Sequence, residues 1–519
     1  MSSLVRAVAS WKARARGLAL LVVAGALASA DPVHGQTPAS RSLPSGLDLP
    51  VVEDTLDNGL RLLVLPRPGA PTVSFVVQYG VGGVHEHRGT TGTAHLLEHL
   101  LFKGSETLGT TDPEAERRLF RVMDAVHDTV LLARASEDEE AIARLEARIE
   151  ALEDSARTFV VANEFDRVLT RAGARGLNAT TDHEATTYFV ELPANRTELW
   201  FALEGDRMAH PVFREFYTER DVVVEERRMR VETSPGGLLY EGHLATAFQV
   251  HPYGQPVVGY RADLATLTRE EVADYYRRFY GAGNAVVTVV GDVDTDQVRT
   301  WAEEYLGPVR RGERPPPVLA KEPEQQGERR IIVRFDAEPQ LRIGWHVPSS
   351  LHPDAPALSV LTTLLTGGRT SRLHRRLVLE DRLATGVFAG RGPGQRFPTL
   401  FTVSATPRAP HTPAEVETAI YEELERLARD GPTASELERV HNRMEAAAVR
   451  RLSSNLGLAF QIAGSEALYG DWRETFRLTE QIQAVDAEDV RRVAATYLTA
   501  DNRTVATLLP ESDGSEEER

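Results

Sequence analysis

The chain has 519 residues, of which 42% are hydrophobic, so it can form two or more globular domains with sizeable cores. Its net charge of −17 argues against nucleic acid as a partner, because an acidic surface repels phosphate groups. There is no cysteine, which excludes disulfides and thiolate metal ligands. Any zinc site must therefore be built from histidine, aspartate or glutamate.

Residues 1–30 resemble a secretory signal peptide. Basic residues precede a short apolar segment at 17–27, and the small residues at 28–30 resemble a cleavage site. An uncleaved anchor is the alternative, although the apolar segment is short for a membrane-spanning helix. We therefore expect a periplasmic or secreted protein without stable membrane insertion, with a flexible lead-in at 31–49.

Two strand-like segments and a glycine-rich loop, within 60–92, lead to an H-x-x-E-H run formed by His95, Glu98 and His99. Histidines four residues apart lie on one helix face, which suits two imidazole ligands of a single zinc ion. Glu98 lies on the same stripe, where it could act on a water molecule at the metal. Apolar neighbours predict a buried helix, in which three ionisable groups need partners or a metal. A solvent-facing polar stripe is the alternative.

Residues 114–163 differ in character from the rest of the chain. Glu, Arg, Ala and Leu dominate, and opposite charges recur three or four positions apart. This pattern is typical of long solvated helices and predicts a helical hairpin. A coiled-coil contact arm is the alternative.

A third metal ligand is expected at Glu226. On a helix, Val222, Val223 and Met229 would share a face with this residue, whereas Glu225 would point away. A carboxylate in the middle of an apolar face needs a partner, which a metal ion would supply.

The sequence leaves two interpretations of Glu226 open, a metal ligand and a surface ion pair. A surface ion pair with Arg230, four residues on, would explain Glu226 without a metal. Glu219 lies two turns earlier on the same face, where it could hold a ligand imidazole in place.

The segment 308–330 is rich in proline and charged residues, and it predicts an inter-domain linker. An acidic helix start, an amphipathic helix, a turn with asparagine and a strand occur in 267–290 and again in 485–509. This repeat indicates two homologous α+β halves. The end of the chain, 511–519, is expected to be an acidic tail.

Together, the H-x-x-E-H run and the segment 219–226 resemble the pitrilysin/insulinase family of zinc peptidases, an inverzincin family. The chain is most similar to bacterial members related to the mitochondrial processing peptidase subunits. The resemblance implies two α/β-sandwich halves, each an antiparallel-rich sheet packed with helices, joined into a half clamshell. The zinc-binding half would be 50–307, and the half without metal ligands would be 331–510.

The resemblance also implies roles for individual residues. One zinc ion per chain would be bound by His95, His99 and Glu226. Glu98 would be the general base that takes a proton from water, and Glu219 would support a ligand. The chain would then be a zinc-dependent endopeptidase acting on peptides or unfolded segments, the alternative being a non-catalytic half-shell scaffold or binding subunit.

An edge strand that holds the substrate is a further implication of the resemblance. The family's Asn-Ala-x-Thr pattern matches Asn178, Ala179, Thr180 and Thr181, and an edge strand can bind an extended peptide by strand addition. Asn178 as an ordinary turn residue is the alternative reading.

One departure from the family concerns the second half. Family members carry an Arg and a Tyr seven residues apart there, and this chain has Val378 and Thr385 at the matching positions. We therefore expect either a related partner subunit that supplies the Arg/Tyr pair, or a homodimer that acts without it.

Overall fold

The computed structural model describes residues 49–511. The expected signal peptide, nearly all of the lead-in and most of the acidic tail lie outside this range. Within the described residues, no helix combines the length and the apolar character that crossing a membrane requires.

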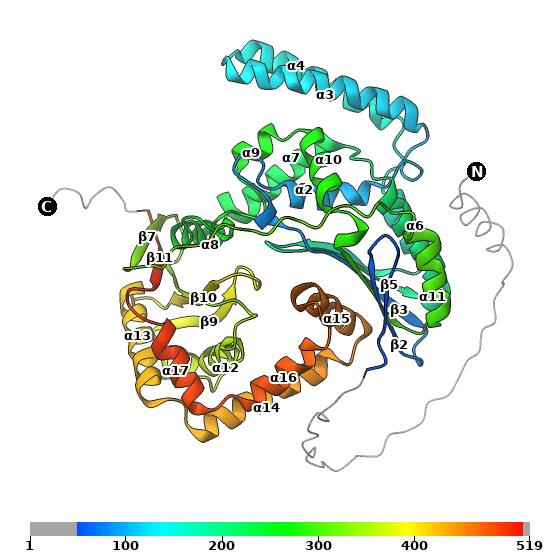
Figure 1. The fold of residues 1–519 in the computed structure, drawn as a ribbon. Helices are drawn as coiled ribbons and strands as arrows, with labels where there is room; N and C mark the ends of the chain where they lie inside the picture. The colour runs from blue at the N-terminus through cyan, green and yellow to red at the C-terminus, as the bar shows by residue number, and fades with distance from the viewer. Residues whose placement is uncertain (1–48, 512–519) are drawn as a thin grey trace, which may run out of the picture.

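Two β-sheets form the framework of the structure (Figure 1). The first is a six-stranded sheet in the order β1 (Val52–Thr55), β2 (Arg61–Pro66), β6 (Ala285–Gly291), β3 (Thr72–Tyr79), β5 (Thr186–Pro193) and β4 (Arg175–Thr181). The second is a five-stranded sheet in the order β7 (Arg329–Arg334), β11 (Arg503–Leu509), β8 (Gln340–Val347), β10 (Thr399–Pro407) and β9 (Ala384–Gly392). In each sheet one pair of strands is parallel, β2 with β6 and β7 with β11, and the other pairs are antiparallel.

Helices cover both sheets. Those of the first half are α2 (Thr93–Leu100), α3 (Pro113–Ala135), α4 (Glu139–Arg157), α5 (Glu164–Arg171), α6 (Thr197–Ala209), α7 (Phe216–Arg227), α8 (Pro235–Ala247), α9 (Arg261–Thr266), α10 (Arg269–Phe279) and α11 (Thr295–Trp301). Those of the second half are α12 (Ala355–Thr366), α13 (Pro413–Asp430), α14 (Ala434–Arg451), α15 (Asn455–Tyr469), α16 (Glu474–Ala484) and α17 (Ala487–Tyr497). The predicted α+β fold of two related halves is confirmed.

The internal repeat is visible in the hydrogen bonds. Helices α10 and α17 both begin with a capping box, and each leads into the strand, β6 or β11, that makes the parallel pair. In the turn between helix and strand, the Asn284 amide donates to the Phe279 carbonyl at 3.0 Å, and the Asn502 amide donates to the Tyr497 carbonyl at 2.8 Å. Both asparagines therefore close the last turn of a helix.

Two helices cross between the halves. Helix α8 follows α7 in the chain but packs on the second sheet, where Leu239 joins Ala506 and Leu508 in one core. Helix α15 belongs to the second half of the sequence but packs on β3 and β6 of the first sheet, with Ile462 in the shared core. The boundary expected at 308–330 is therefore a boundary in sequence, whereas each folded half includes one helix from the other.

Helices α3 and α4 form an antiparallel pair that lies outside the sheet layers, beside α7 and α9 (Figure 1). Arg214 fastens the base of this hairpin with an ion pair to Glu116, in which the two side chains are 1% exposed. The same guanidinium donates to the carbonyls of Lys103, Ser105 and Leu108 in the segment that follows α2. One buried arginine thus joins the hairpin to the segment after α2.

Replacing one member of this buried pair leaves the other charge without its partner. We expect Arg214→Met to lower the free energy of unfolding by about 3–5 kcal/mol, because Glu116 would stay buried and unpaired. The measurement is urea unfolding followed by tryptophan fluorescence. Arg117→Met is the control, since its pair with Glu106 is half-exposed and should matter by at most about 1 kcal/mol. Equal effects of the two substitutions would contradict the assigned role of Arg214.

Candidate metal centre

Helix α2 is held at its N-terminus by a buried carboxylate. Glu86 accepts hydrogen bonds from the backbone N–H groups of Gly92 at 2.8 Å and Ala94 at 2.6 Å, which are otherwise unpaired at a helix start. Gly92 has a φ of +89°, and a Cβ there would approach Leu264 and the Val258 carbonyl to 2.8 Å. The glycine and the glutamate therefore fix where α2 begins, and with it the direction of its histidines.

Packing fixes the rotation of α2. The side chains of Leu96, Leu97 and Leu100 are 0% exposed, which leaves His95 and His99 on the remaining face. That face is turned toward α7, and the helix is buried, as the apolar pattern around the H-x-x-E-H run predicts.

Helix α7 is fixed by different contacts. Val223 is 0% exposed in the core of the first half. Arg227 forms a bidentate ion pair with Glu241 of α8, with both distances at 2.9 Å. A turn of π-helix, Arg228–Glu232, follows α7 directly. These contacts hold Glu226, one residue before Arg227, opposite the two histidines of α2.

The structure brings His95, His99 and Glu226 together. Glu226 Oε2 lies 3.7 Å from His95 Nε2 and 3.4 Å from His99 Nε2. One ligand atom from each residue lies within 4.8 Å of the others. Glu225 instead points to solvent and pairs with Arg228, as the helix geometry predicts.

These residues fit a zinc ion by chemistry and by spacing. Two imidazole nitrogens and a carboxylate oxygen are a donor set found in catalytic zinc sites. Zinc–ligand bonds of about 2.0–2.2 Å place tetrahedral ligand atoms roughly 3.3–3.6 Å apart. The two nitrogen–oxygen distances to Glu226 Oε2 are close to this range.

A ring of charged groups surrounds the three residues. Glu219 Oε2 lies 3.3 Å from His99 Nδ1, and Lys103 Nζ holds the other Glu219 oxygen at 2.6 Å. A carboxylate behind a ligand imidazole fixes the orientation of the ring and raises its basicity. Arg230 contacts Glu226 Oε1 at 2.8 Å, so the ion pair with Arg230 and the approach to the histidines coexist on different oxygens of one carboxylate.

The two histidines differ in pKa because their neighbours differ. Burial, together with the nearby His99, lowers the pKa of His95 to about 4 and keeps this imidazole neutral, the form that binds metals. Burial also acts to lower the pKa of His99, but hydrogen bonds to Glu219 and Glu226 outweigh it and raise the pKa to about 9. A metal ion bound there would replace the proton as the positive charge between two carboxylates.

Glu98 faces the end of the edge strand. Its Oε2 accepts a hydrogen bond from the Thr181 hydroxyl, on the last residue of β4. Burial raises the pKa of Glu98, and the Thr181 hydrogen bond offsets this only in part. A raised pKa brings a carboxylate closer to the range in which general bases work near neutral pH.

The predicted edge strand lies where the resemblance places it. Among the described strands, β4 pairs with β5 alone and is the last strand of its sheet. Asn178 and Thr180 are exposed, whereas Ala179 is buried, and the Asn178 side chain bonds the backbone N–H of Ala179 at 2.9 Å. Asn178 is thus a strand residue, because it pairs with Phe189 in the ladder, and the turn reading is wrong.

Two expectations about α7 need correction. Val222 and Met229 were expected to share a buried face with Glu226, but their exposed fractions are 45% and 57%. The reason is that the space beside this face is a groove, so of Val222, Val223 and Met229 only Val223 reaches the core. Sequence reasoning also missed Glu86 and Lys103; the one available signal was that Lys103 lies one helical turn after His99.

Comparisons with known proteins agree with this architecture. The model "Insulinase (Peptidase family M16)" matches residues 61–116 and 155–261, and the model "Peptidase M16 inactive domain" matches 266–444. The chain therefore belongs to the insulinase family of peptidases, family M16. The unmatched stretch 117–154 comprises most of the hairpin α3–α4.

Named relatives point in the same direction. The chain is 29% identical over 468 residues to the zinc protease PqqE of Helicobacter pylori, covering 88% of this chain and 92% of that one. It is 25% identical over 477 residues to a probable mitochondrial-processing peptidase subunit beta of Arabidopsis thaliana, covering 88% and 78%. The crystal structure of a protease from Helicobacter pylori superposes with a TM-score of 0.76 at 26% identity, covering 89% of this chain and 100% of that one. The periplasmic protease PqqL of Escherichia coli shares the fold, with a TM-score of 0.66 at 17% identity, over 90% of this chain and 48% of that one.

Adjacent glutamates on α7 provide a matched test of the metal site. We expect Glu226→Gln to abolish stoichiometric zinc binding, because a neutral amide replaces the carboxylate that faces both histidines. Glu225→Gln is the control and should retain one zinc ion per chain, since Glu225 points to solvent. Zinc content after gel filtration is measured by elemental mass spectrometry. Full zinc content in Glu226→Gln would refute the assigned ligand set.

Proposed function

We propose that this protein is a zinc-dependent endopeptidase that hydrolyses peptides or unfolded protein segments. His95, His99 and Glu226 would hold the metal. The observation that carries the proposal is the position of Glu98, on the same helix as both histidines and bonded to the last residue of an exposed sheet edge. A carboxylate suited to act as a base, three residues suited to bind a metal, and an edge strand with which a peptide could pair thus lie close together.

Each residue of the site has a defined task in this reaction. The outer edge of β4 binds the substrate backbone by strand addition, which brings a peptide bond toward Thr181 and Glu98. Zinc bound there supplies Lewis acidity, which lowers the pKa of water and polarises a carbonyl group. The Glu98 carboxylate accepts the proton of the attacking water and then returns it to the leaving amine. Glu219, held by Lys103, keeps the His99 ring oriented.

The rival function is a non-catalytic half-shell, in which the fold serves as a scaffold or binding subunit. The match of the second half to a model called an inactive domain concerns only residues 266–444. Matching Gly367 to Gly104 puts Leu358, Leu361 and Thr362 of α12 opposite His95, Glu98 and His99, and the two leucines are fully buried. The second half would therefore be structural under either function, and Glu98 in the first half favours catalysis because a scaffold has no use for a base.

The substitution Glu98→Gln separates catalysis from metal binding. We expect this variant to keep one zinc ion per chain and to lose hydrolysis by about 100-fold or more, because the amide cannot accept a proton. The assay follows cleavage of a reduced, alkylated protein by gel electrophoresis and mass spectrometry. Unchanged hydrolysis in zinc-loaded Glu98→Gln would refute the mechanism, and absence of hydrolysis in the zinc-loaded wild type under all conditions would favour the scaffold.

A partner chain is part of the proposed function. Val378 lies in the π-helix His374–Glu380 and Thr385 in β9, and neither side chain can supply the positive charge and the phenol that the family's Arg/Tyr pair would bring. We propose that a related subunit carrying that pair completes the site, the alternative being a homodimer without it. A periplasmic or secreted location, which the expected signal peptide implies, belongs to the same proposal.

Assembly can be tested in the native cell. We expect affinity purification of the tagged chain to recover a second protein of similar fold with the Arg/Tyr pair, and its addition to raise hydrolysis by at least about tenfold. Native mass spectrometry measures the stoichiometry of the complex. A fully active species that contains only this chain would instead establish the homodimer.

A further inference from the structure

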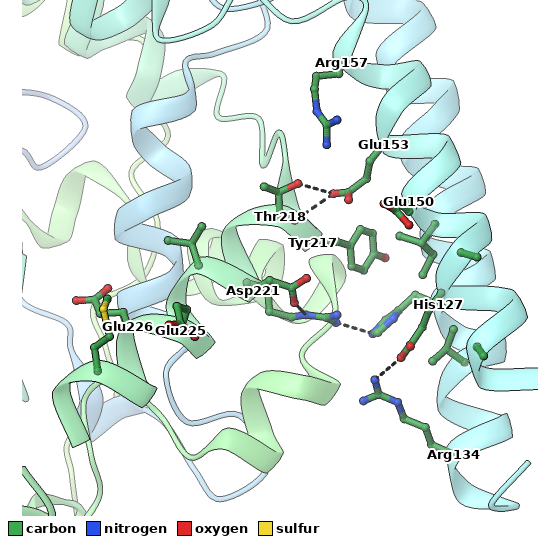
Figure 2. Close-up of a pocket in the computed structure, with 18 of the residues that line it drawn as sticks. His127, Arg134, Glu150, Glu153, Arg157, Tyr217, Thr218, Asp221, Glu225 and Glu226 are labelled. Atoms are coloured by element: carbon green, nitrogen blue, oxygen red, sulfur yellow. Dashed lines mark hydrogen bonds and ion pairs between the residues drawn. The ribbon is translucent and has the colours of Figure 1, made fainter. Parts of the chain in front are cut away.

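The hairpin α3–α4 and helix α7 enclose a groove with a volume of about 1250 Å³ (Figure 2). This exceeds the range of roughly 300–1,000 Å³ that is typical of small-molecule pockets. One wall consists of a stripe from each hairpin helix, His127, Val130 and Arg134 from α3 and Ala143, Ala147 and Glu150 among those from α4. The segment that the family model leaves unmatched thus provides one wall of the groove.

The opposite side of the groove leads to the metal centre. The stripe on α7 begins at Tyr217 and Thr218, of which Thr218 bonds Glu153 of α4, and it passes through Asp221 and Val222. It ends at Glu226 and the π-turn that follows, and Figure 2 shows Glu225 and Glu226 at the end of α7 away from the hairpin. The groove therefore opens at a residue of the candidate zinc site.

Exposed apolar side chains lie in this groove. Val222 and Met229 are large hydrophobic residues with exposed fractions of 45% and 57%, and both flank Glu226. Exposed apolar surface lining a groove is typical of a binding surface. Charged residues of both signs line the hairpin wall of the groove and can bond to a polypeptide backbone. Among them are Arg134 and Glu146, which form an ion pair at 2.8 Å.

The length of the groove indicates what it can hold. Thr218 and Arg230 are twelve residues apart, which corresponds to about 18 Å along a helix. A peptide in extended conformation covers this length with about five residues. A ligand of this shape would continue from the metal centre along α7.

We propose that this groove binds the substrate polypeptide on one side of the scissile bond, as an extension of the catalytic site that the hairpin adds to the family fold. The inference rests on the proposed function. It adds a substrate class, because an extended chain of several residues beyond the cleaved bond would bind more tightly than a short peptide.

The experiment measures binding separately from hydrolysis, in the zinc-loaded Glu98→Gln protein. The probes are fluorescein-labelled peptides from reduced, alkylated α-lactalbumin, namely a pentapeptide and two decapeptides that extend it at either end. Fluorescence anisotropy gives each dissociation constant. We expect one decapeptide to bind at least about tenfold more tightly than the pentapeptide.

Three tryptophan substitutions on α4 locate the effect. Ala147 lines the groove, so Ala147→Trp should fill it and remove the gain in affinity, leaving pentapeptide binding within about twofold. Ala151 is exposed on the same helix outside the groove lining, so Ala151→Trp should retain the gain. Ala143→Trp, also in the groove, provides a second blocking variant, and zinc content and thermal midpoint verify folding.

The outcomes separate this proposal from the proposed function. A decapeptide gain that Ala147→Trp and Ala143→Trp abolish and Ala151→Trp keeps supports the groove, whether or not the wild type hydrolyses peptides. Equal affinity for all three peptides, or a gain that survives both groove substitutions, would overturn it even if the wild type is an active peptidase.

Discussion

The arrangement of α2 against α7 is the constraint on which the site depends. Three ionisable side chains, His95, His99 and Glu226, meet in a place with little access to solvent, and ions in such places are costly unless they are paired or bind a metal. Lys103 pairs with Glu219, Arg230 pairs with one oxygen of Glu226, and the three ligand atoms lie close enough together to hold one cation. Local packing alone would not gather so many charges.

The exchange of helices ties this site to the whole chain. Helix α8 begins nine residues after Glu226 and packs on the second sheet, and Arg227 of α7 is bonded to Glu241 of α8. On the other side of the site, Glu184 in the turn after β4 accepts the backbone N–H groups of Gln395 and Arg396 from the second half. Helix α7, which carries Glu226, and the turn that follows the edge strand β4 are therefore both attached to the second half. This half thus contributes rigidity to the site even though it offers no metal ligands.

The sequence predicted what depends on periodicity and missed what depends on packing between distant segments. Spacing alone placed His95 and His99 on one face and separated Glu226 from Glu225, because both follow from helix geometry. The same reasoning placed Met229 on an apolar face with Glu226, but an apolar stripe does not reveal whether a neighbouring segment will cover it. The crossing of α8 and α15 was invisible for the same reason: an apolar helix face indicates burial but not which sheet provides the cover. Glu86 was missed because its partners are backbone groups, which leave no pattern of side chains.

The hairpin α3–α4 illustrates why an insertion near a site is more than additional length. A solvated pair of helices would be stable through its own charge pattern and would need only a loose connection at its base. Instead, a nearly inaccessible ion pair holds its base, and Asp124 and Glu153 extend the attachment along its length through Tyr217 and Thr218 of α7. Burying an ion pair costs several kcal/mol of desolvation, so it is weak evidence for stability but good evidence for a fixed geometry. The fixed geometry sets the distance between the hairpin and the helix that carries Glu226, and that distance is the width of the groove.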